Sequence, residues 1–182
     1  GVLTLLAISA AICPALVRTS MGFRSMLMLL FCASPLILGP NSGPELGWFE
    51  RVDASGMEEW VARLLWNGTY PVLPWVFYIL LGTVLHDLRE DSRARERGVV
   101  LGILATSLTL ALSVAEGVDW ALTSGDAVLT FFPASMPFLV VSGTMVALAL
   151  RVLEGEEESG REPLMGEKLS LLEPAGRLSL TI

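Results

Sequence analysis

The chain has 182 residues, of which 53% are hydrophobic and 17% are charged, and its net charge is −7. A soluble domain usually has about 25% charged residues, so this composition argues against an ordinary soluble protein. The acidic balance provides no basic patch for a nucleic acid, and both cysteines lie inside apolar runs, which predicts neither a disulfide framework nor a metal site.

The apolar residues are gathered in five long runs that contain no Asp, Glu, Lys or Arg, namely Val2–Val17, Ser25–Pro44, Leu64–Leu85, Gly98–Ala115 and Ala127–Leu150. A membrane-spanning helix needs roughly 20 mostly apolar residues. We therefore predict an all-α fold, a polytopic transmembrane helical bundle of about five spans plus the start of a sixth, in one domain over residues 1–182. Five core helices of a soluble protein are the alternative, but no run carries the polar stripe of a surface helix. The predicted spans cover residues 2–17, 22–38, 71–85, 98–115 and 135–150.

The two ends of the chain indicate a fragment of a longer protein. Gly1 is not an initiator methionine, and the first apolar run lacks the basic segment and cleavage motif of a signal peptide. A new apolar run starts near Leu178 and stops at Ile182. We expect neighbouring helices of the same protein to be missing on both sides.

The placement of Lys and Arg predicts the orientation, because positively charged loops stay in the cytoplasm. Ten of the twelve cations fall on one face of the five-span arrangement, and only Arg51 and Arg63 fall on the other. We predict a multi-pass integral membrane protein with the Gly1 side outside and residues 151–177 in the cytoplasm. Residues 151–175, which include an acidic run, are expected to form a flexible cytoplasmic linker.

Residues 41–70 form the longest predicted loop, on the outer face. Within it, Ser55 and Glu58 have the spacing of a capping box at the start of a helix. Apolar residues follow at helical spacing from Met57 to Leu65, and charged residues occupy the opposite face. This pattern predicts a short amphipathic helix that lies in the outer interface or caps the bundle.

The third predicted span opens with Pro71 and Pro74, at a helix start where missing amide donors cost least. Tyr70 and Trp75 lie at interfacial depth and are candidates for the wall of a substrate-binding pocket, although the construction of a helix start also explains them. Gly82 is expected to let a neighbouring helix approach closely.

The segment from Tyr70 to Gly82 resembles a recurrent segment of membrane proteins related to heparan-α-glucosaminide N-acetyltransferase, and of related uncharacterised bacterial and archaeal membrane proteins. Three further places resemble this family in order and spacing. They are the opening Gly-Val-Leu, the closing Gly-Arg-Leu-Ser-Leu-Thr, and a spacing similar to the family's Pro-Ser-Pro entry to a later span, made by Phe132, Pro133, Ser135, Pro137 and Phe138. The family's Arg-x-x-Asp-Leu-x-Arg-Gly segment and membrane-embedded histidine are not in this chain. Its catalytic histidine therefore cannot be transferred, and the catalytic residues stay unknown.

Three ionisable residues are further candidates for substrate binding. His86, the only histidine, lies at the inner end of the third span. The helix dipole favours a histidine there, and the alternative is a role near a cytosolic acyl donor; its position does not match the family's histidine. Glu116 and Asp119 are three residues apart at the outer end of the fourth span and share a face if the helix continues. Ordinary interfacial residues are the alternative explanation for this pair.

The resemblance implies an acyltransferase that moves an acyl group from an acyl-CoA co-substrate on the cytosolic side to a sugar or other polar acceptor outside. The fragment would supply scaffold and pocket wall, without a metal or a covalently bound cofactor. The alternatives are a transporter, although its expected mid-span charges are absent from the sequence, and a structural membrane subunit. The expected partners are the lipid bilayer, the missing helices and a second copy in a homo-oligomer, with no nucleic acid.

Overall fold

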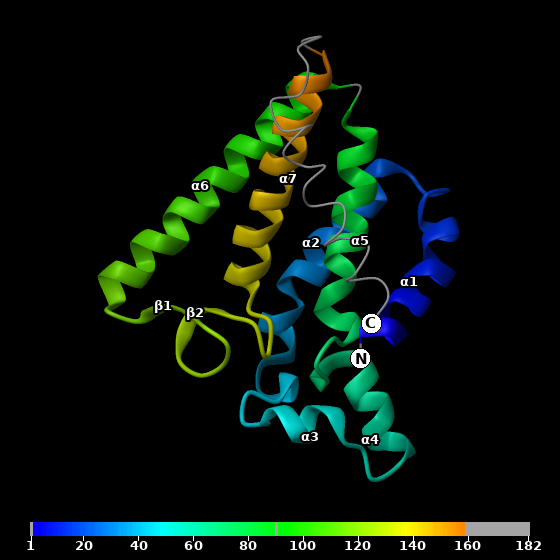
Figure 1. Cartoon of the computed structure of the whole chain (residues 1–182), viewed down its shortest axis with the longest axis vertical. Coiled ribbons are helices and arrows are strands. Elements are labelled where there is room, and N and C mark those ends of the chain that lie inside the picture. Colours follow the sequence, from blue (N-terminus) through cyan, green and yellow to red (C-terminus); the bar gives the residue numbers. More distant parts are fainter. Residues whose placement is uncertain (1, 90, 159–182) are drawn as a thin grey trace, which may run out of the picture. The chain divides into compact units, whose positions relative to one another are not determined.

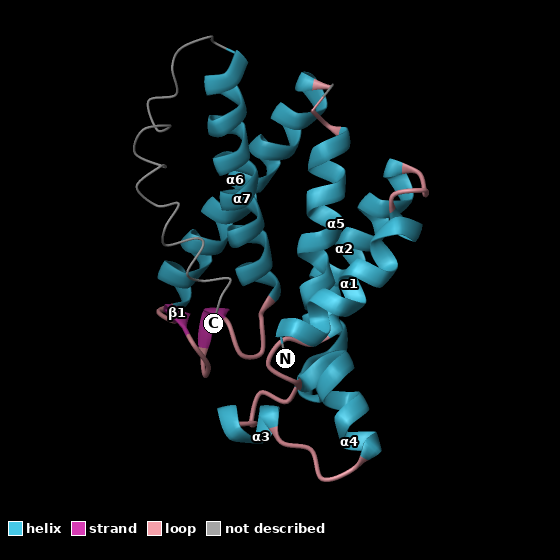
Figure 2. Cartoon of the chain, turned by 45° about the vertical axis from the view of Figure 1, so that its right-hand side comes forward, coloured by secondary structure: helices cyan, strands magenta, loops and turns pink. Residues whose placement is uncertain are grey.

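The computed structural model describes residues 2–89 and 91–158. Helices dominate this part of the chain, joined by short turns and one pair of strands (Figures 1 and 2). The chain divides into two compact units, residues 1–144 and 145–182. In chain order the elements are α1 (Val2–Leu16), α2 (Met21–Leu38), the 3₁₀ turn η1 (Gly39–Ser42), α3 (Trp48–Val52), α4 (Met57–Ala62), the π turn η2 (Arg63–Asn67), α5 (Val72–Asp87), α6 (Ser92–Glu116), β1 (Asp119–Leu122), β2 (Ala127–Thr130) and α7 (Met136–Glu158).

The long helices begin and end where local side chains favour it. The Ser20 hydroxyl accepts a hydrogen bond from the Phe23 amide at 3.3 Å and caps α2, and Asp91 caps α6 through the Ala94 amide at 3.0 Å. Gly117 ends α6 at φ +64°, a left-handed conformation that favours glycine. Each of the five long helices overlaps one of the five predicted spans.

The prediction of about five membrane spans is nevertheless wrong. In the described residues, two helices are long and apolar enough to cross a membrane, namely Met21–Ser42, which joins α2 to its following turn, and Arg93–Glu116 in α6. The pair Met57–Asn67 and Val72–Asp87, bent by 42° at its break, is a third candidate if it is counted as one span. Helix α1 has 15 residues and is about 22 Å long, short of the roughly 30 Å hydrocarbon core.

The uncharged runs overestimate helix length because they also contain turn and strand residues. The run Leu64–Leu85 is interrupted between Asn67 and Val72, where the backbone leaves the helix. The run Ala127–Leu150 starts with strand β2 and a loop, and only then enters α7. Apolar composition alone does not distinguish these segments from a continuous helix.

The all-α prediction is also wrong, because a small parallel sheet follows α6. Strand β1 pairs with β2, with Asp119 opposite Ala127 and Leu122 opposite Thr130. The connection between the strands passes through Gly125, whose φ of +99° is easily reached only by glycine. The sheet leads the chain from the end of α6 to the loop that precedes α7.

Helices α2 and α5 lie side by side in both views (Figures 1 and 2), and they are antiparallel because the start of α2 meets the end of α5. Val76 and Leu80 of α5 and Leu139 of α7 are fully buried. Leu139 belongs to a buried cluster with Cys32, Phe77 and Ala134. At the start of α2 the buried Arg24 forms a salt bridge with Asp87 at the end of α5. This ion pair holds the start of α2 and the end of α5 at the same end of the helix pair.

Gly82 is not the close-packing position that the sequence predicts. A Cβ at Gly82 would have no atom of the described residues within 4 Å. Close approach occurs instead at Gly143 in the first part of α7, where a Cβ would lie 2.9 Å from Phe77 Cζ. Another close contact occurs at Gly102 of α6, where a Cβ would lie 2.6 Å from Thr144 Oγ1. Small residues therefore let the first part of α7, up to Thr144, approach α5 and α6.

The capping box predicted at Ser55 and Glu58 does not form, because the N-cap of α4 is Gly56, which makes no side-chain cap hydrogen bond. Helix α4 begins at Met57 after Gly56, so Glu59 rather than Glu58 occupies the third helical position. The Glu59 carboxylate accepts hydrogen bonds from the Ser55 amide and hydroxyl, at 2.9 and 2.7 Å. The predicted amphipathic helix is also short, because α4 gives way to the π turn η2 at Arg63.

The start of the predicted cytoplasmic linker is helical. Helix α7 continues to Glu158, so residues 151–158 extend the helix instead of forming a flexible segment. The remainder of the predicted linker and the start of the sixth span lie outside the described residues.

Candidate functional site

The candidate site forms where the chain enters α5. The chain turns tightly before Tyr70, and this turn brings Gly68 directly against the Arg63 carbonyl. A Cβ has no room there, so the turn requires glycine. Leu73 then departs from helical geometry, with φ −96° and ψ 117°. Across this break the rings of Tyr70 and Trp75 meet, with their centroids 5.1 Å apart.

A second segment, far along the sequence, completes the group of rings. Phe131 and Phe132 follow β2 directly, and their centroids lie 5.1 Å from Trp75 and 6.0 Å from Tyr70, respectively. Both pairs are edge-on, an arrangement that the charge distribution of aromatic rings favours. Trp48 of α3 adds a fifth ring, 5.2 Å from Phe132. We call these five residues the aromatic cluster.

Ser135 holds the loop that carries Phe131 and Phe132. Its hydroxyl accepts a hydrogen bond from the Thr130 amide at 3.1 Å and donates one to the Val128 carbonyl at 2.9 Å. The Thr130 hydroxyl in turn donates to the Pro133 carbonyl at 2.8 Å. The central serine of the Pro-Ser-Pro spacing therefore has a local structural role, because it closes the loop between β2 and α7.

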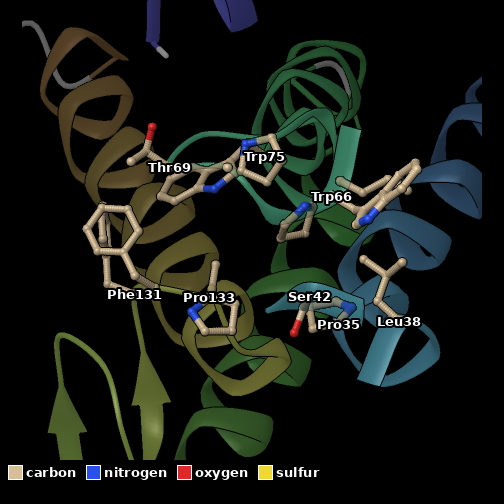
Figure 3. Close-up of a pocket in the computed structure, with 14 residues that line it drawn as sticks. Pro35, Leu38, Ser42, Trp66, Thr69, Trp75, Phe131 and Pro133 are labelled. Carbon is tan, nitrogen blue, oxygen red and sulfur yellow. The ribbon is translucent and has the colours of Figure 1, made fainter. Parts of the chain in front are cut away.

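The aromatic cluster borders a narrow cavity, shown with its lining side chains in Figure 3. Its wall combines Pro35 and Leu38 of α2, Trp75 of α5, and Phe131 and Pro133 of the loop after β2. The free volume is about 10 Å³, which is room for about one water molecule. A larger ligand can bind here only when these side chains move apart.

The lining of this cavity offers apolar surface and a few hydrogen-bonding groups. Its polar side chains are those of Ser42, Thr69, Trp66 and Trp75, and none of the lining residues is acidic or a histidine. Among the described residues no group of three or more His, Cys, Asp or Glu could hold a metal ion. The lining of this cavity therefore offers apolar surface and hydrogen-bonding groups, but no carboxylate or imidazole that could act as a general base.

The structure brings together two of the residues predicted from the sequence and separates the other three from them. Tyr70 and Trp75 are in contact, as described above. Glu116 and Asp119 are exposed, at the end of α6 and in β1, and neither lines the aromatic cavity. The His86 side chain is 78% exposed, and its Nδ1 lies 3.6 Å from Asp87 Oδ1, away from this cavity's lining.

Sequence analysis missed Trp48 and Phe131 as members of the site. Phe132 enters the sequence analysis only through the family resemblance. The Phe-Phe-Pro sequence after a short β-branched segment was the available signal, because paired aromatic residues in a loop are costly to expose. No local pattern places Phe131 and Phe132 beside Tyr70, which lies some 60 residues earlier in the sequence.

Comparisons with protein-family models, with curated proteins and with solved structures find no match to this chain. The resemblance to the N-acetyltransferase family therefore stays a prediction from the sequence.

Proposed function

We propose that this chain is the acceptor-binding wall of an integral membrane acyltransferase, which transfers an acyl group from acyl-CoA to a sugar or other polar acceptor. One observation carries the proposal. Tyr70 and Trp75, the residues selected from the sequence, pack against Phe131 and form one aromatic wall with it. Small-molecule sites are mostly apolar and aromatic, with a few polar groups that fix the orientation of the ligand.

The exposed surfaces support a membrane location. Only 17% of the apolar window of Met21–Ser42 and 6% of that of Arg93–Glu116 is buried within the chain. Exposed apolar side chains such as Leu104 and Val114 follow one another along α6, whereas a soluble monomer rarely exposes so large an apolar surface. The lipid bilayer, further helices of the parent protein and a second copy of the chain are the partners proposed for this surface.

The chain connections favour three crossings. The salt bridge between Arg24 and Asp87 puts the start of α2 and the end of α5 at one end, and α6 begins there after a short turn. If α2 and α6 both cross the membrane, they cross in the same direction. The bent pair Met57–Asn67 and Val72–Asp87 must then bring the chain back.

The cations then suggest the sidedness. Arg24, Arg89 and Arg93 lie at the end where α2 begins, and Arg51 lies at the opposite end, where it bonds to the Ser42 carbonyl. Positively charged segments favour the cytoplasm, so we place the first end inside. The aromatic cluster is then on the outer side, where the acceptor would bind.

Sugar binding by the chain in detergent tests the proposal. We would titrate a panel of monosaccharides that includes glucosamine and follow the heat of binding. Trp75→Ala should weaken binding at least about tenfold, because large aromatic side chains dominate the binding energy of such walls. Trp120→Ala is the matched control, since this exposed tryptophan lies in β1 and does not line the cavity.

The same samples distinguish a binding wall from a complete enzyme. Acetyl-CoA added with the sugar should give no acetylated sugar, because the cavity lining contains no base. The proposal fails if no sugar binds, or if Trp75→Ala and Trp120→Ala weaken binding equally. Acetylation by this chain alone would show that we have misplaced the chemistry.

A further inference from the structure

A second, larger recess opens beside the aromatic cluster. It is lined by residues of α1, α3, α4 and η2 and has a volume of about 320 Å³, at the lower end of the range for ligand pockets. Thr69 lines both this recess and the aromatic cavity, and Trp48 and Tyr70 contribute to its wall. The recess is large enough for a small ligand without any movement of the rings.

Two guanidinium groups line this recess, and one of them has no acidic partner. Arg51 is only 2% exposed, and its donors bond to backbone carbonyls. Within the described residues no carboxylate forms a salt bridge with it. The carbonyl acceptors belong to Leu46 at 3.2 Å, Asn67 at 3.2 Å, Ser42 at 3.4 Å and Gly43.

Arg63 adds a second positive charge, which only one carboxylate balances. Its Nη2 donates to Glu59 Oε1 at 2.8 Å, and its Nε donates to the Asp53 carbonyl at 3.2 Å. Burial and, to a smaller extent, the charge of Arg63 lower the pKa of Arg51, but an arginine stays protonated in proteins. The two arginines and the single carboxylate leave a net positive charge at the recess.

The remaining polar groups of the lining add donors to this charge. Trp48 Nε1, Trp60 Nε1 and the Tyr70 hydroxyl make no hydrogen bond to any described residue. No acidic residue lines the recess. A ligand that accepts hydrogen bonds and carries negative charge would therefore match both the donors and the field.

We propose that this recess binds a phosphate group, carried either by a lipid headgroup or by a soluble phosphate ester. Guanidinium groups pair well with phosphate oxygens, in geometry and in charge. Tryptophans at interfacial depth would place a bound lipid headgroup at this level of the bilayer. The recess adjoins the aromatic cavity at Thr69, and the proposal does not depend on acyl transfer.

Binding to the whole chain in a phosphate-free maltoside detergent tests the two sources. In the first arm, glycerol 3-phosphate is titrated, with acetate as the matched anion that lacks phosphorus. In the second arm, phosphatidylglycerol is added and the thermal unfolding midpoint is followed, with diacylglycerol as the matched lipid without phosphate. We expect binding or stabilisation by at least one phosphate compound and by neither control.

Variants assign any binding to this recess. Arg63→Gln should weaken binding at least about tenfold, because a charge-assisted hydrogen bond is lost. Trp60→Phe removes only the indole donor while keeping a ring, and should weaken binding about threefold. It keeps the test informative if Arg63→Gln does not fold. Arg18→Gln removes the same charge at an exposed position outside the recess and should leave the affinity unchanged.

The outcomes separate the two sources and decide the proposal. Binding of glycerol 3-phosphate supports a soluble ester, and stabilisation by phosphatidylglycerol alone supports a lipid headgroup. The proposal is overturned if neither compound binds, or if acetate or diacylglycerol acts equally well. It is also overturned if Arg18→Gln weakens binding as much as Arg63→Gln, or if neither Arg63→Gln nor Trp60→Phe weakens it.

Discussion

Two glycine substitutions in the long helices should have opposite effects on stability. Gly143→Ala places a Cβ 2.9 Å from Phe77 Cζ, 3.1 Å from Phe77 Cε1 and 3.3 Å from Leu81 Cδ2. The Phe77 ring is buried and packs edge-on against Tyr78 at 5.1 Å, so it cannot easily move away. Gly82→Ala meets no atom of the described residues within 4 Å.

The magnitude follows from two opposing effects. Inserting a methyl group into a packed core costs about 1–3 kcal/mol, and replacing a helical glycine by alanine contributes about 1 kcal/mol. Gly143→Ala should therefore lower the free energy of unfolding by about 0–2 kcal/mol, whereas Gly82→Ala should raise it by up to about 1 kcal/mol. The helix propensity is common to both variants and cancels in their difference, which isolates the packing cost.

Thermal unfolding of both variants in one detergent, followed by circular dichroism, measures this difference. For a chain of this size 1 kcal/mol corresponds to about 2–4 °C, so the midpoints should differ by roughly 2–12 °C, with Gly143→Ala the lower. If the two midpoints coincide, the first part of α7 does not approach α5 as closely as described. If Gly82→Ala is the less stable variant, a neighbouring helix does pack there, as the sequence alone suggests.

Two further substitutions test the polar contacts that hold the fold and the site. Ser135→Ala removes hydrogen bonds to backbone groups of β2 and should lower the unfolding midpoint by the equivalent of about 1–3 kcal/mol; an unchanged midpoint would show that Ser135 does not hold the loop. Asp87→Asn leaves the buried Arg24 without its carboxylate partner and should lower the free energy of unfolding. Breaking a fully buried ion pair costs roughly 3–5 kcal/mol, and the loss here should be smaller because the Asp87 side chain is 33% exposed. His86→Ala, its exposed neighbour, is the control and should stay within about 0.5 kcal/mol of the parent chain; equal losses would argue against the ion pair.

The sequence predicts the positions of the long helices better than it predicts the number of membrane spans or the pairing of the strands. Caps such as Ser20 and breaks such as Gly117 are local, so the positions of the long helices follow from composition and from a few residues. The number of spans depends on unbroken length, and an apolar run conceals a break such as the one after Asn67. The parallel strand pair is missed for a related reason, because pairing between Asp119 and Ala127 has no signature in either segment alone.

The sequence predicts the part of the candidate site that Tyr70 and Trp75 form, but not the part that Phe131 forms. Tyr70 and Trp75 stand close together in a segment whose prolines mark a helix start, so local reasoning finds them. Phe131 reaches the same place through β2 and the loop that Ser135 closes. That placement depends on the tertiary fold, which no single segment encodes.

The two exceptions to the cation pattern carry more information than the pattern itself. Counting Lys and Arg treats Arg51 and Arg63 as the minority on the outer face, because the rule considers charges in solvated loops. Both arginines instead line the recess beside the aromatic cluster. Burying a guanidinium group is costly unless its N–H donors form hydrogen bonds. The carbonyls of Ser42, Gly43, Leu46 and Asn67 satisfy most of the Arg51 donors but leave its charge unneutralised. The proposed anion would neutralise this charge and accept hydrogen bonds from the indole donors of the same recess.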